Sequence, residues 1–222
     1  DPDTRPMARP PFISVATSQP PLPPRFAFVR SPVWEQAEPA TREAFDELVA
    51  ALGDNVVEVE LGSGFGTATD WQRTIMEVEM AHNFHRDYVK GGEQLSERLR
   101  HLIERGRGFT AVDYLAAVGG IGPLNETLDA IFDEYDAIIT PAAPGEAPRG
   151  LGATGNPIFC SLWTYLGTPA VSLPIMHSEA GLPLGVQVVG RRDNDARLLR
   201  SARWLATKVQ GKARGTRKGK SS

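Results

Sequence analysis

Two strand patterns separated by a helical pattern constrain the fold of this chain most. The run "FAFV" at 26–29 is rich in β-forming residues and ends at Ser31-Pro32, which predicts a strand followed by a turn. The segment "EPATREAFDELVAAL" at 38–52 combines helix formers with apolar side chains at helical spacing, and Gly53 stops it. "NVVEVEL" at 55–61 then alternates as a second strand. A parallel strand pair requires such a crossover helix, so the predicted class is α/β.

An apolar run predicts the central strand of the sheet. Ala137-Ile138-Ile139, between Tyr135 and Pro141, has the density of a fully buried strand. Open α/β sheets place their ligand sites at the carboxyl ends of such strands. Two further strands are predicted at 169–175 and 182–190, on either side of the polar turn "HSEAG". Further helical patterns cover residues 69–88, 95–104, 111–118, 124–134 and 193–208.

The charge distribution argues against a nucleic-acid partner. The formal net charge is −3, but the tail from Gly211 carries five of the 24 Lys and Arg residues and no acid. The rest of the chain is therefore more acidic than the total suggests. Binding to phosphates requires clustered cations on the folded body, so we predict no nucleic-acid binding.

The single cysteine and the hydropathy pattern indicate the cellular compartment. Cys160 alone excludes an internal disulfide and a cysteine-based zinc site, which suits a reducing compartment. No apolar run approaches the roughly 18 residues of a membrane span, and no signal-peptide pattern opens the chain. We therefore expect a cytoplasmic protein without a membrane partner.

The chain is predicted to have three parts. Residues 1–25 form an extended, proline-rich lead-in, residues 26–210 the α/β portion, and residues 211–222 a basic, disordered tail. The sequence opens with "DPDTRPMARPPF" and has no initiator methionine, so we expect that it does not start where its gene starts.

The stretch 154–174, "TGNPIFCSLWTYLGTPAVSLP", is the most unusual part of the chain. A solvated loop would not contain so many large apolar side chains. An ordinary core helix would avoid Gly155-Asn156-Pro157 at its start and Gly167-Thr168-Pro169 at its end. We interpret the stretch as a buried segment that shapes a pocket.

Two motifs that could bind phosphate or metal are incomplete. "GSGFG" at 62–66 follows a strand, but Thr67 stands where the dinucleotide fingerprint needs its third glycine, which favours a flexible turn. Glu79, His82 and His85 are spaced three apart on one predicted helix and could share a face. Neither a second Glu-x-x-His nor a His-Glu-x-x-His is present, so a partly buried polar seam is the favoured interpretation and no metal is predicted.

No catalytic nucleophile can be identified from the residues. Cys160 and Ser161 lie in the unusual stretch and His177 follows it, but the sequence places no base beside either side chain. A lone cysteine is most often a core residue, so packing is the simpler role for Cys160. The serine of the elbow motif G-x-S-x-G is displaced by one position at 62–66, so that motif is also absent.

Four segments carry a family resemblance. "FVRSPVWEQAEPAT", "YDAIITPAAPGEAP", the stretch 154–174 and "GLPLGVQVVGRRDND" are similar, in order and spacing, to the carboxyl-terminal half of amidase signature enzymes. The resemblance covers about residues 1–208. It implies part of an α/β/α sandwich around a mixed, largely parallel sheet. It also implies hydrolysis of amides without a cofactor.

The resemblance does not extend to the catalytic groups of the family. Those enzymes use a lysine, a serine in a cis peptide and a nucleophilic serine, the two serines lying in a Gly-Gly-Ser-Ser-Gly-Gly-Ser type loop. This sequence has no such loop, and its lysines are Lys90 and those from Lys208 onward, whereas the family's lysine precedes its serines. We therefore predict no catalytic residue in the chain and no hydrolysis by the chain alone.

The resemblance implies the following role for this chain. It would supply the scaffold and pocket of an amidase that forms an acyl-serine and releases an acid with ammonia or an amine. The predicted partners are a small amide substrate, an amino-terminal half or partner subunit, and further copies of the chain. The alternative is a non-catalytic interaction or regulatory subunit that kept the fold. The predicted substrate-pocket residues are Thr154, Gly155, Asn156, Phe159, Cys160, Trp163 and Gly167.

Overall fold

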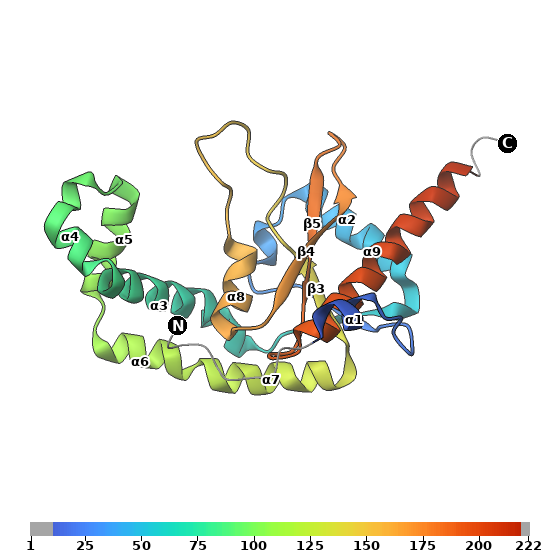
Figure 1. Cartoon of the computed structure of the whole chain (residues 1–222), viewed down its shortest axis with the longest axis horizontal. Helices are drawn as coiled ribbons and strands as arrows, with labels where there is room; N and C mark the ends of the chain where they lie inside the picture. Colours follow the sequence, from blue (N-terminus) through green and yellow to red (C-terminus); the bar gives the residue numbers. More distant parts are fainter. Residues whose placement is uncertain (1–10, 219–222) are drawn as a thin grey trace.

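The protein forms one five-stranded sheet covered by helices, with a helical arm that projects to one side (Figure 1). The computed structural model describes residues 11–218, with side chains up to Gln210. The strand order is β2-β1-β3-β5-β4. The strands are β1 (Phe26–Val29), β2 (Val56–Val59), β3 (Ala137–Pro141), β4 (Ala170–His177) and β5 (Pro183–Val189).

The sheet is mixed, as predicted. Strand β1 pairs in parallel with β2 and with β3, whereas β5 pairs antiparallel with β3 and with β4. Parallel and antiparallel pairs are thus equal in number among the described strands, and the expected parallel majority is not found. The reason is that β5 returns from β4 through a hairpin, whose short turn can join only antiparallel neighbours, and β5 then lies between β4 and β3, which run in the same direction.

Alternate residues of each strand face opposite sides of the sheet and build two separate cores. Phe26 and Phe28 point to one side, where helices α2 (Pro39–Leu52) and α9 (Asp195–Lys218) cover the sheet. The ring of Phe28 stacks on that of Phe45 from α2, with centroids 5.6 Å apart. This core confirms the predicted crossover helix between the first two strands.

The opposite face of the sheet carries the second core. Ala27, Val29 and Ile138 point toward helices α7 (Ile121–Glu134) and α8 (Ile158–Leu166). Helices therefore lie on both faces of the sheet, which gives the three-layer α/β/α arrangement. Among the described residues no helix is both long enough and apolar enough to span a bilayer.

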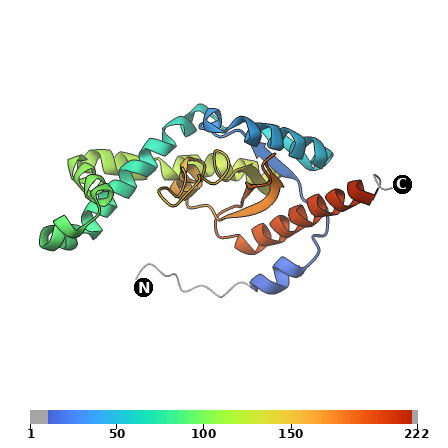
Figure 2. The same ribbon diagram turned by 90° about the horizontal axis from the view of Figure 1, so that it is seen from above.

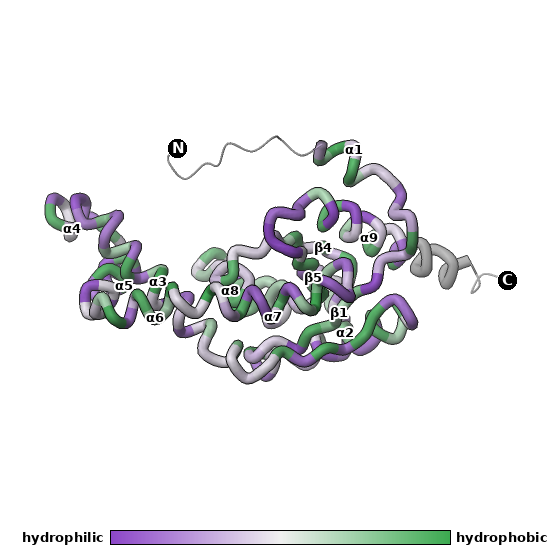
Figure 3. Tube along the Cα trace, turned by 90° about the horizontal axis from the view of Figure 1, so that it is seen from below, coloured by the Kyte–Doolittle hydropathy of each residue, from purple (hydrophilic) through white to green (hydrophobic). Residues whose placement is uncertain are grey.

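Four helices form the projecting arm, at the opposite end of the molecule from α9 (Figures 1 and 3). The sequence predicts one helix over 69–88, but the structure has two, with a break at Phe84, whose ψ of 9° leaves the helical region. His85 therefore begins a new helix, and the polar face expected from Glu79 to His85 is not continuous. The helices of the arm are α3 (Ala68–Asn83), α4 (His85–Gly91), α5 (Glu97–Gly108) and α6 (Ala111–Gly119).

A buried ion pair and a glycine join α3 to α5. The Glu77 carboxylate is fully buried, and Arg105 Nε donates to its Oε2 at 2.9 Å while Nη2 lies against Oε1. One residue further along, Gly106 lets the backbones approach closely, because a Cβ there would lie 1.9 Å from the Glu77 carbonyl oxygen. These contacts hold α3 against α5, and the spacing of apolar residues in the sequence does not reveal them.

Replacing Arg105 with alanine should destabilise the protein by about 3 kcal/mol, the lower end of the range for breaking a buried pair. The change leaves the Glu77 carboxylate buried without its counter-charge, although the Arg105 side chain is 41% exposed and water can partly replace it. Denaturant unfolding would measure the loss. Arg107→Ala is the matched control, since the exposed Arg107 guanidinium lies over the half-buried Tyr88 ring, 5.2 Å from its centroid. Equal losses in both variants would contradict the assignment.

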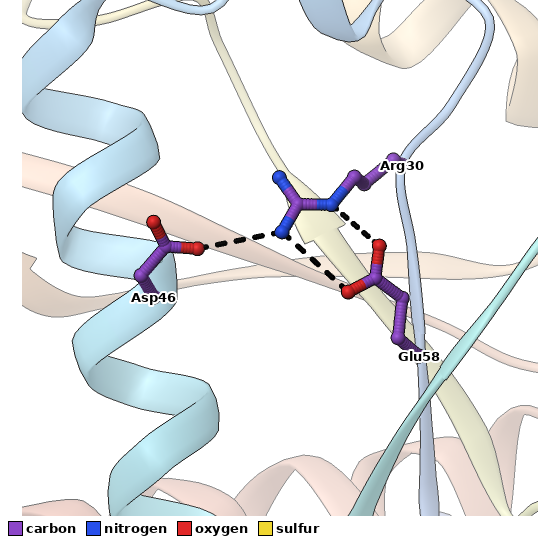
Figure 4. Close-up of polar contacts among 3 residues, drawn as sticks. All are labelled: Arg30, Asp46 and Glu58. Carbon is purple, nitrogen blue, oxygen red and sulfur yellow. Dashed lines mark hydrogen bonds and ion pairs between the residues drawn. The ribbon is translucent and has the colours of Figure 1, made fainter.

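Arg30 fixes the end of β1 to its neighbours (Figure 4). Its Nε donates to Glu58 of β2 at 2.5 Å, and its Nη2 lies 3.4 Å from Asp46 of α2. The guanidinium also lies over the Trp34 ring, 4.6 Å from the centroid. The hydrogen bond with Glu58 raises the pKa of Arg30. This cluster holds a strand, a helix and the following turn together.

The two ends of the chain differ in part from the prediction. Helix α1 (Phe12–Thr17) lies within the lead-in predicted to be extended, and it packs beside α9 (Figure 2). Helix α9 continues through Lys218, past the predicted boundary at 210. Residues 1–10 and 219–222 lie outside the described part.

Short 3-10 turns complete the fold at η1 (Trp34–Gln36), η2 (Gly53–Asn55), η3 (Ser63–Thr67) and η4 (Gly92–Gln94).

Candidate functional site

The stretch 154–174 forms a loop end, a helix and a strand in succession. Asn156 Oδ1 accepts a hydrogen bond from the backbone N–H of Ile158 at 3.1 Å, which satisfies one free donor at the start of α8. Gly167 ends the helix in the left-handed conformation, with φ of 65°, and β4 follows at once. The residues that disfavour a long helix thus bound a short one.

The amino end of α8 borders the largest hollow described, with a volume of about 820 Å³. It lies beyond the carboxyl end of β3, where an α/β sheet is expected to hold its ligand. The loop 142–157 crosses from β3 to α8 above the sheet and forms one wall (Figure 1). The lining residues are Gln36, Glu38, Arg98, Ala142, Ala143, Pro144, Gly145, Glu146, Ala147, Pro148, Thr154, Gly155, Asn156, Pro157, Ser172, Pro174, Pro183 and Gly185.

Three small residues, Ala142, Ser172 and Gly185, form the part of this hollow nearest the sheet. The backbone N–H of Ala142 donates to the carbonyl oxygen of Gly185 at 3.0 Å, which ties the loop to β5. A Cβ at position 185 would lie 2.9 Å from both Ala142 Cβ and Ser172 Oγ. Gly185 therefore provides room for the Ser172 hydroxyl at the hollow.

The structure places the predicted pocket residues in two groups. Thr154, Gly155 and Asn156 line the hollow. Phe159 and Trp163 do not, because each is only 1% exposed within the protein interior. Their apolar character serves packing around the short helix α8 rather than a wall of this hollow.

Gly155 and Gly167, two of the predicted pocket residues, lie on either side of α8. Within the described part of the chain, the nearest atoms to an added Cβ lie at 3.7 and 3.8 Å, ordinary contact distances. Both residues have positive φ, 94° and 65°, which side chains rarely tolerate. Their role is to turn the chain into and out of α8.

Neither candidate nucleophile has a base within the described part of the chain. Cys160 Sγ lies 3.5 Å from the carbonyl oxygen of Ala142, as a weak donor. Ser161 Oγ donates to the carbonyl oxygen of Pro157 at 3.4 Å. His177 is exposed at the far end of β4 and hydrogen bonds to neither. The geometry provides a lined hollow without an activated nucleophile among residues 11–210.

Cys160 should react slowly with thiol reagents at neutral pH. Burial raises the pKa of its thiol, so less thiolate is present than in a free cysteine. For the same reason the contribution of Cys160 to stability is intact below the ordinary thiol pKa and falls as the pH rises above it. The measurement is the rate of reaction with a disulfide reagent, native against denatured. A native rate equal to that of free cysteine would contradict this assignment.

The histidine cluster holds no assembled ligand set. Within the described residues no three His, Cys, Asp or Glu side chains converge as a metal would require. Glu79 instead accepts a hydrogen bond from the hydroxyl of Tyr114 at 3.1 Å, which joins α3 to α6.

Sequence reasoning missed two charged residues of the hollow. Glu38 precedes α2, and its backbone N–H donates to the carbonyl oxygen of Pro144 at 2.8 Å, while its carboxylate lies close to Gly145. Arg98 reaches the hollow from α5 of the arm. Both lie far from the loop 142–157 in the sequence, and no local pattern indicates that tertiary structure brings them there.

A second hollow, of about 460 Å³, lies between α3 and α8. Its walls are mainly large apolar side chains, among them Ile75, Met76 and Met80. It contains no residue of the loop 142–157, and it lies away from the carboxyl end of β3. We therefore take the 820 Å³ hollow as the candidate site.

Solved structures define the class of fold. A crystal structure of an amidase superposes with a TM-score of 0.76 at 23% identity, over 86% of this chain and 47% of that one. The 6-aminohexanoate cyclic dimer hydrolase in complex with its substrate superposes with a TM-score of 0.69 at 22% identity, over 92% of this chain and 48% of that one. The α/β/α arrangement described above is thus the fold of these enzymes.

The sequence comparison gives the family. The Amidase family model matches residues 1–199, so the chain belongs to the amidase family. Fatty acid amide hydrolase of Medicago truncatula is 34% identical over 123 residues, 50% of this chain and 20% of the relative. Fatty acid amide hydrolase of Arabidopsis thaliana is 35% identical over 126 residues, 50% of this chain and 21% of the relative. The aligned region covers less than a third of each of these relatives.

Proposed function

We propose that this chain supplies the scaffold and one wall of the substrate pocket of an enzyme that hydrolyses carboxylic amides. The observation that carries the proposal is the 820 Å³ hollow beyond β3, in a chain of the amidase family. Thr154, Asn156 and Ser172 offer polar groups there for an amide or its leaving group. The reaction would pass through an acyl-serine and yield an acid with ammonia or an amine.

The nucleophilic serine and its lysine are proposed to come from an amino-terminal half or a partner subunit. Supporting this, Cys160 and Ser161 have no base among the described residues, and the chain spans about half of the solved amidase structures it resembles. We also place the complete enzyme in the cytoplasm, since a single thiol suits a reducing compartment.

The edge of β4 supports the presence of such a partner. The carbonyl oxygen of Pro169 accepts from Gly190 of the β5 side at 2.9 Å, so the backbone groups of alternate residues, Ala170 and Ser172, point away from β5. Strand β4 is an edge of the described sheet and eight residues long. Long free edges pair readily with another strand, and Ser172 of this strand also borders the hollow. A strand added here would lie next to the candidate site.

Exposed apolar side chains on α6 also favour a covering partner or further copies of the chain. Val112 and Leu115 are 75% and 66% exposed, and Val118, one turn further along the helix, is 38% exposed. A stripe of this kind on a surface helix is typical of an interface. We expect the isolated chain to self-associate or to bind a hydrophobic dye.

The test compares the chain alone with the chain plus the amino-terminal half of an amidase-family relative or of its own gene. We expect no amide hydrolysis and no labelling by a serine-directed fluorophosphonate from the chain alone, and both activities from the combination. Thr154→Ala and Asn156→Ala should then alter the KM of the combined enzyme, whereas Arg86→Gln on the arm should not. Hydrolysis by the chain alone that is lost on mutating Ser161 or Cys160 would overturn the proposal. A combination that binds but stays unlabelled would favour a non-catalytic role.

A further inference from the structure

A third hollow lies between the lead-in and α9, and it shares no residue with the candidate site. Its volume is about 260 Å³. Helix α1 and the residues that follow it run alongside α9 and close this hollow on one side (Figure 2). The lining residues that matter are Ser18, Gln19, Arg200, Arg203, Trp204 and Lys208.

The two segments that form this hollow carry no acids, and the one in α9 carries cations. Residues 11–24 and 196–210 contain no Asp or Glu. Earlier in the same helix region, Arg191 pairs with Asp129 and Asp133, and Arg197 pairs with Asp136. Within the described part of the chain, Arg200, Arg203 and Lys208 form no such ion pair. No acid of the described residues therefore neutralises their charges, and the three side chains line one cavity.

Neighbouring groups hold these cations in place without compensating their charge. Arg203 Nη1 donates to the carbonyl oxygen of Ala16 in α1 at 3.4 Å. The Lys208 ammonium lies over the Trp204 ring, 5.5 Å from its centroid. Arg200 is half-buried, so its charge is only partly screened by water. Positions 200, 203/204 and 207/208 share one face of a helix, which directs these side chains to the same hollow.

We propose that this hollow binds a phosphate group, either inorganic phosphate or the phosphate of a small ester. Two arginines and a lysine supply the charge-assisted donors that an oxyanion requires. The Gln19 amide can donate a further hydrogen bond from the opposite wall, where the Ser18 hydroxyl donates to the carbonyl oxygen of Val15 at 2.7 Å. A volume of about 260 Å³ is below that of most pockets for drug-sized ligands, which suits a small anion. The Trp204 ring offers a flat apolar surface for the organic part of an ester.

Calorimetric titration of the 222-residue chain with sodium phosphate tests this site, at an ionic strength kept constant with sodium chloride. We expect saturable binding that Arg200→Gln weakens about tenfold or more, because it removes a charge-assisted hydrogen bond. The matched control is Arg86→Gln, which removes one positive charge from α4 at the far end of the arm and should leave the affinity unchanged. Phenyl phosphate in a parallel titration distinguishes the two sources: tighter binding than phosphate identifies an ester, and equal binding identifies the free ion.

Either of two results would overturn the proposal. Heats that do not saturate with either ligand, or equal weakening by Arg200→Gln and Arg86→Gln, would show only a general attraction of anions. Thermal melts of each variant establish that it is folded. If Arg200→Gln does not fold, Arg203→Gln and the conservative Arg200→Lys take its place, with partial retention of affinity expected for the lysine.

Discussion

Replacing Gly106 with alanine is expected to destabilise the protein by at least about 3 kcal/mol, the upper part of the range for overpacking. An alanine Cβ would lie 1.9 Å from the carbonyl oxygen of Glu77 and 2.5 Å from its carbonyl carbon. These atoms belong to the backbone of α3, so no change of rotamer relieves the clash. Helices α3 and α5 must separate, and the buried pair of Glu77 with Arg105 is lost with them.

The same helix offers a matched control for this prediction. Gly108→Ala adds the same methyl group two residues later, where nothing lies within 4 Å. It should be neutral or stabilise the helix by up to about 1 kcal/mol, since alanine has the higher helix propensity. Denaturant unfolding of both variants measures the difference. If the two variants had the same stability, α3 and α5 would not be packed as described.

Replacing Trp163 with alanine is expected to cost about 3–5 kcal/mol, the range for removing a large aromatic side chain from a core. The side chain is 1% exposed and packs in the core on the α8 face of the sheet, with Leu128 and Ile138 among its members. The sequence interpretation placed Trp163 in the wall of the substrate pocket. A wall residue would instead affect substrate binding and leave the melting temperature nearly unchanged.

Trp163→Phe separates the two interpretations further. The indole Nε1 is buried and has no hydrogen-bond partner among the described residues, so phenylalanine removes no polar contact seen there. We expect a loss of only about 1–2 kcal/mol, from the smaller volume. Thermal unfolding of the alanine and phenylalanine variants, side by side, provides the measurement. An alanine variant as stable as the original protein would disprove a core role.

The sheet and its crossover helix could be predicted because local patterns specify them. The apolar run at 137–139 is typical of a buried strand, and all three residues are fully buried in β3. The hairpin of β4 and β5 is likewise encoded by two strand patterns around a polar turn. The break at Phe84 could not be predicted in this way, because the residues around it keep a helical pattern on both sides.

The candidate site could be predicted only in part. Thr154 to Asn156 were found because they lie in a stretch whose composition is unusual. Phe159 and Trp163 lie in the same stretch but face the interior. They lie one helical turn apart on the buried side of α8, and the composition of the stretch does not show which side of the helix is buried. Glu38 and Arg98 reach the hollow from other elements, and a single sequence does not show that the tertiary structure brings these two residues to it.

The strand order also determines when each part of the protein can fold. Arg25, which precedes β1, bonds to Asp136, which precedes β3, and 111 residues separate the two. Ribosomes add about 5–20 residues per second, so about 5–20 seconds pass between the synthesis of β1 and that of β3, its neighbour in the centre of the sheet. During that time Phe26 and Phe28 lie on a strand with an open edge, whereas the hairpin of β4 and β5 can form within microseconds of its synthesis. Slower translation should therefore lengthen the exposure of the amino-terminal strands and lower the yield of folded protein, and chaperones that bind nascent apolar segments should restore it.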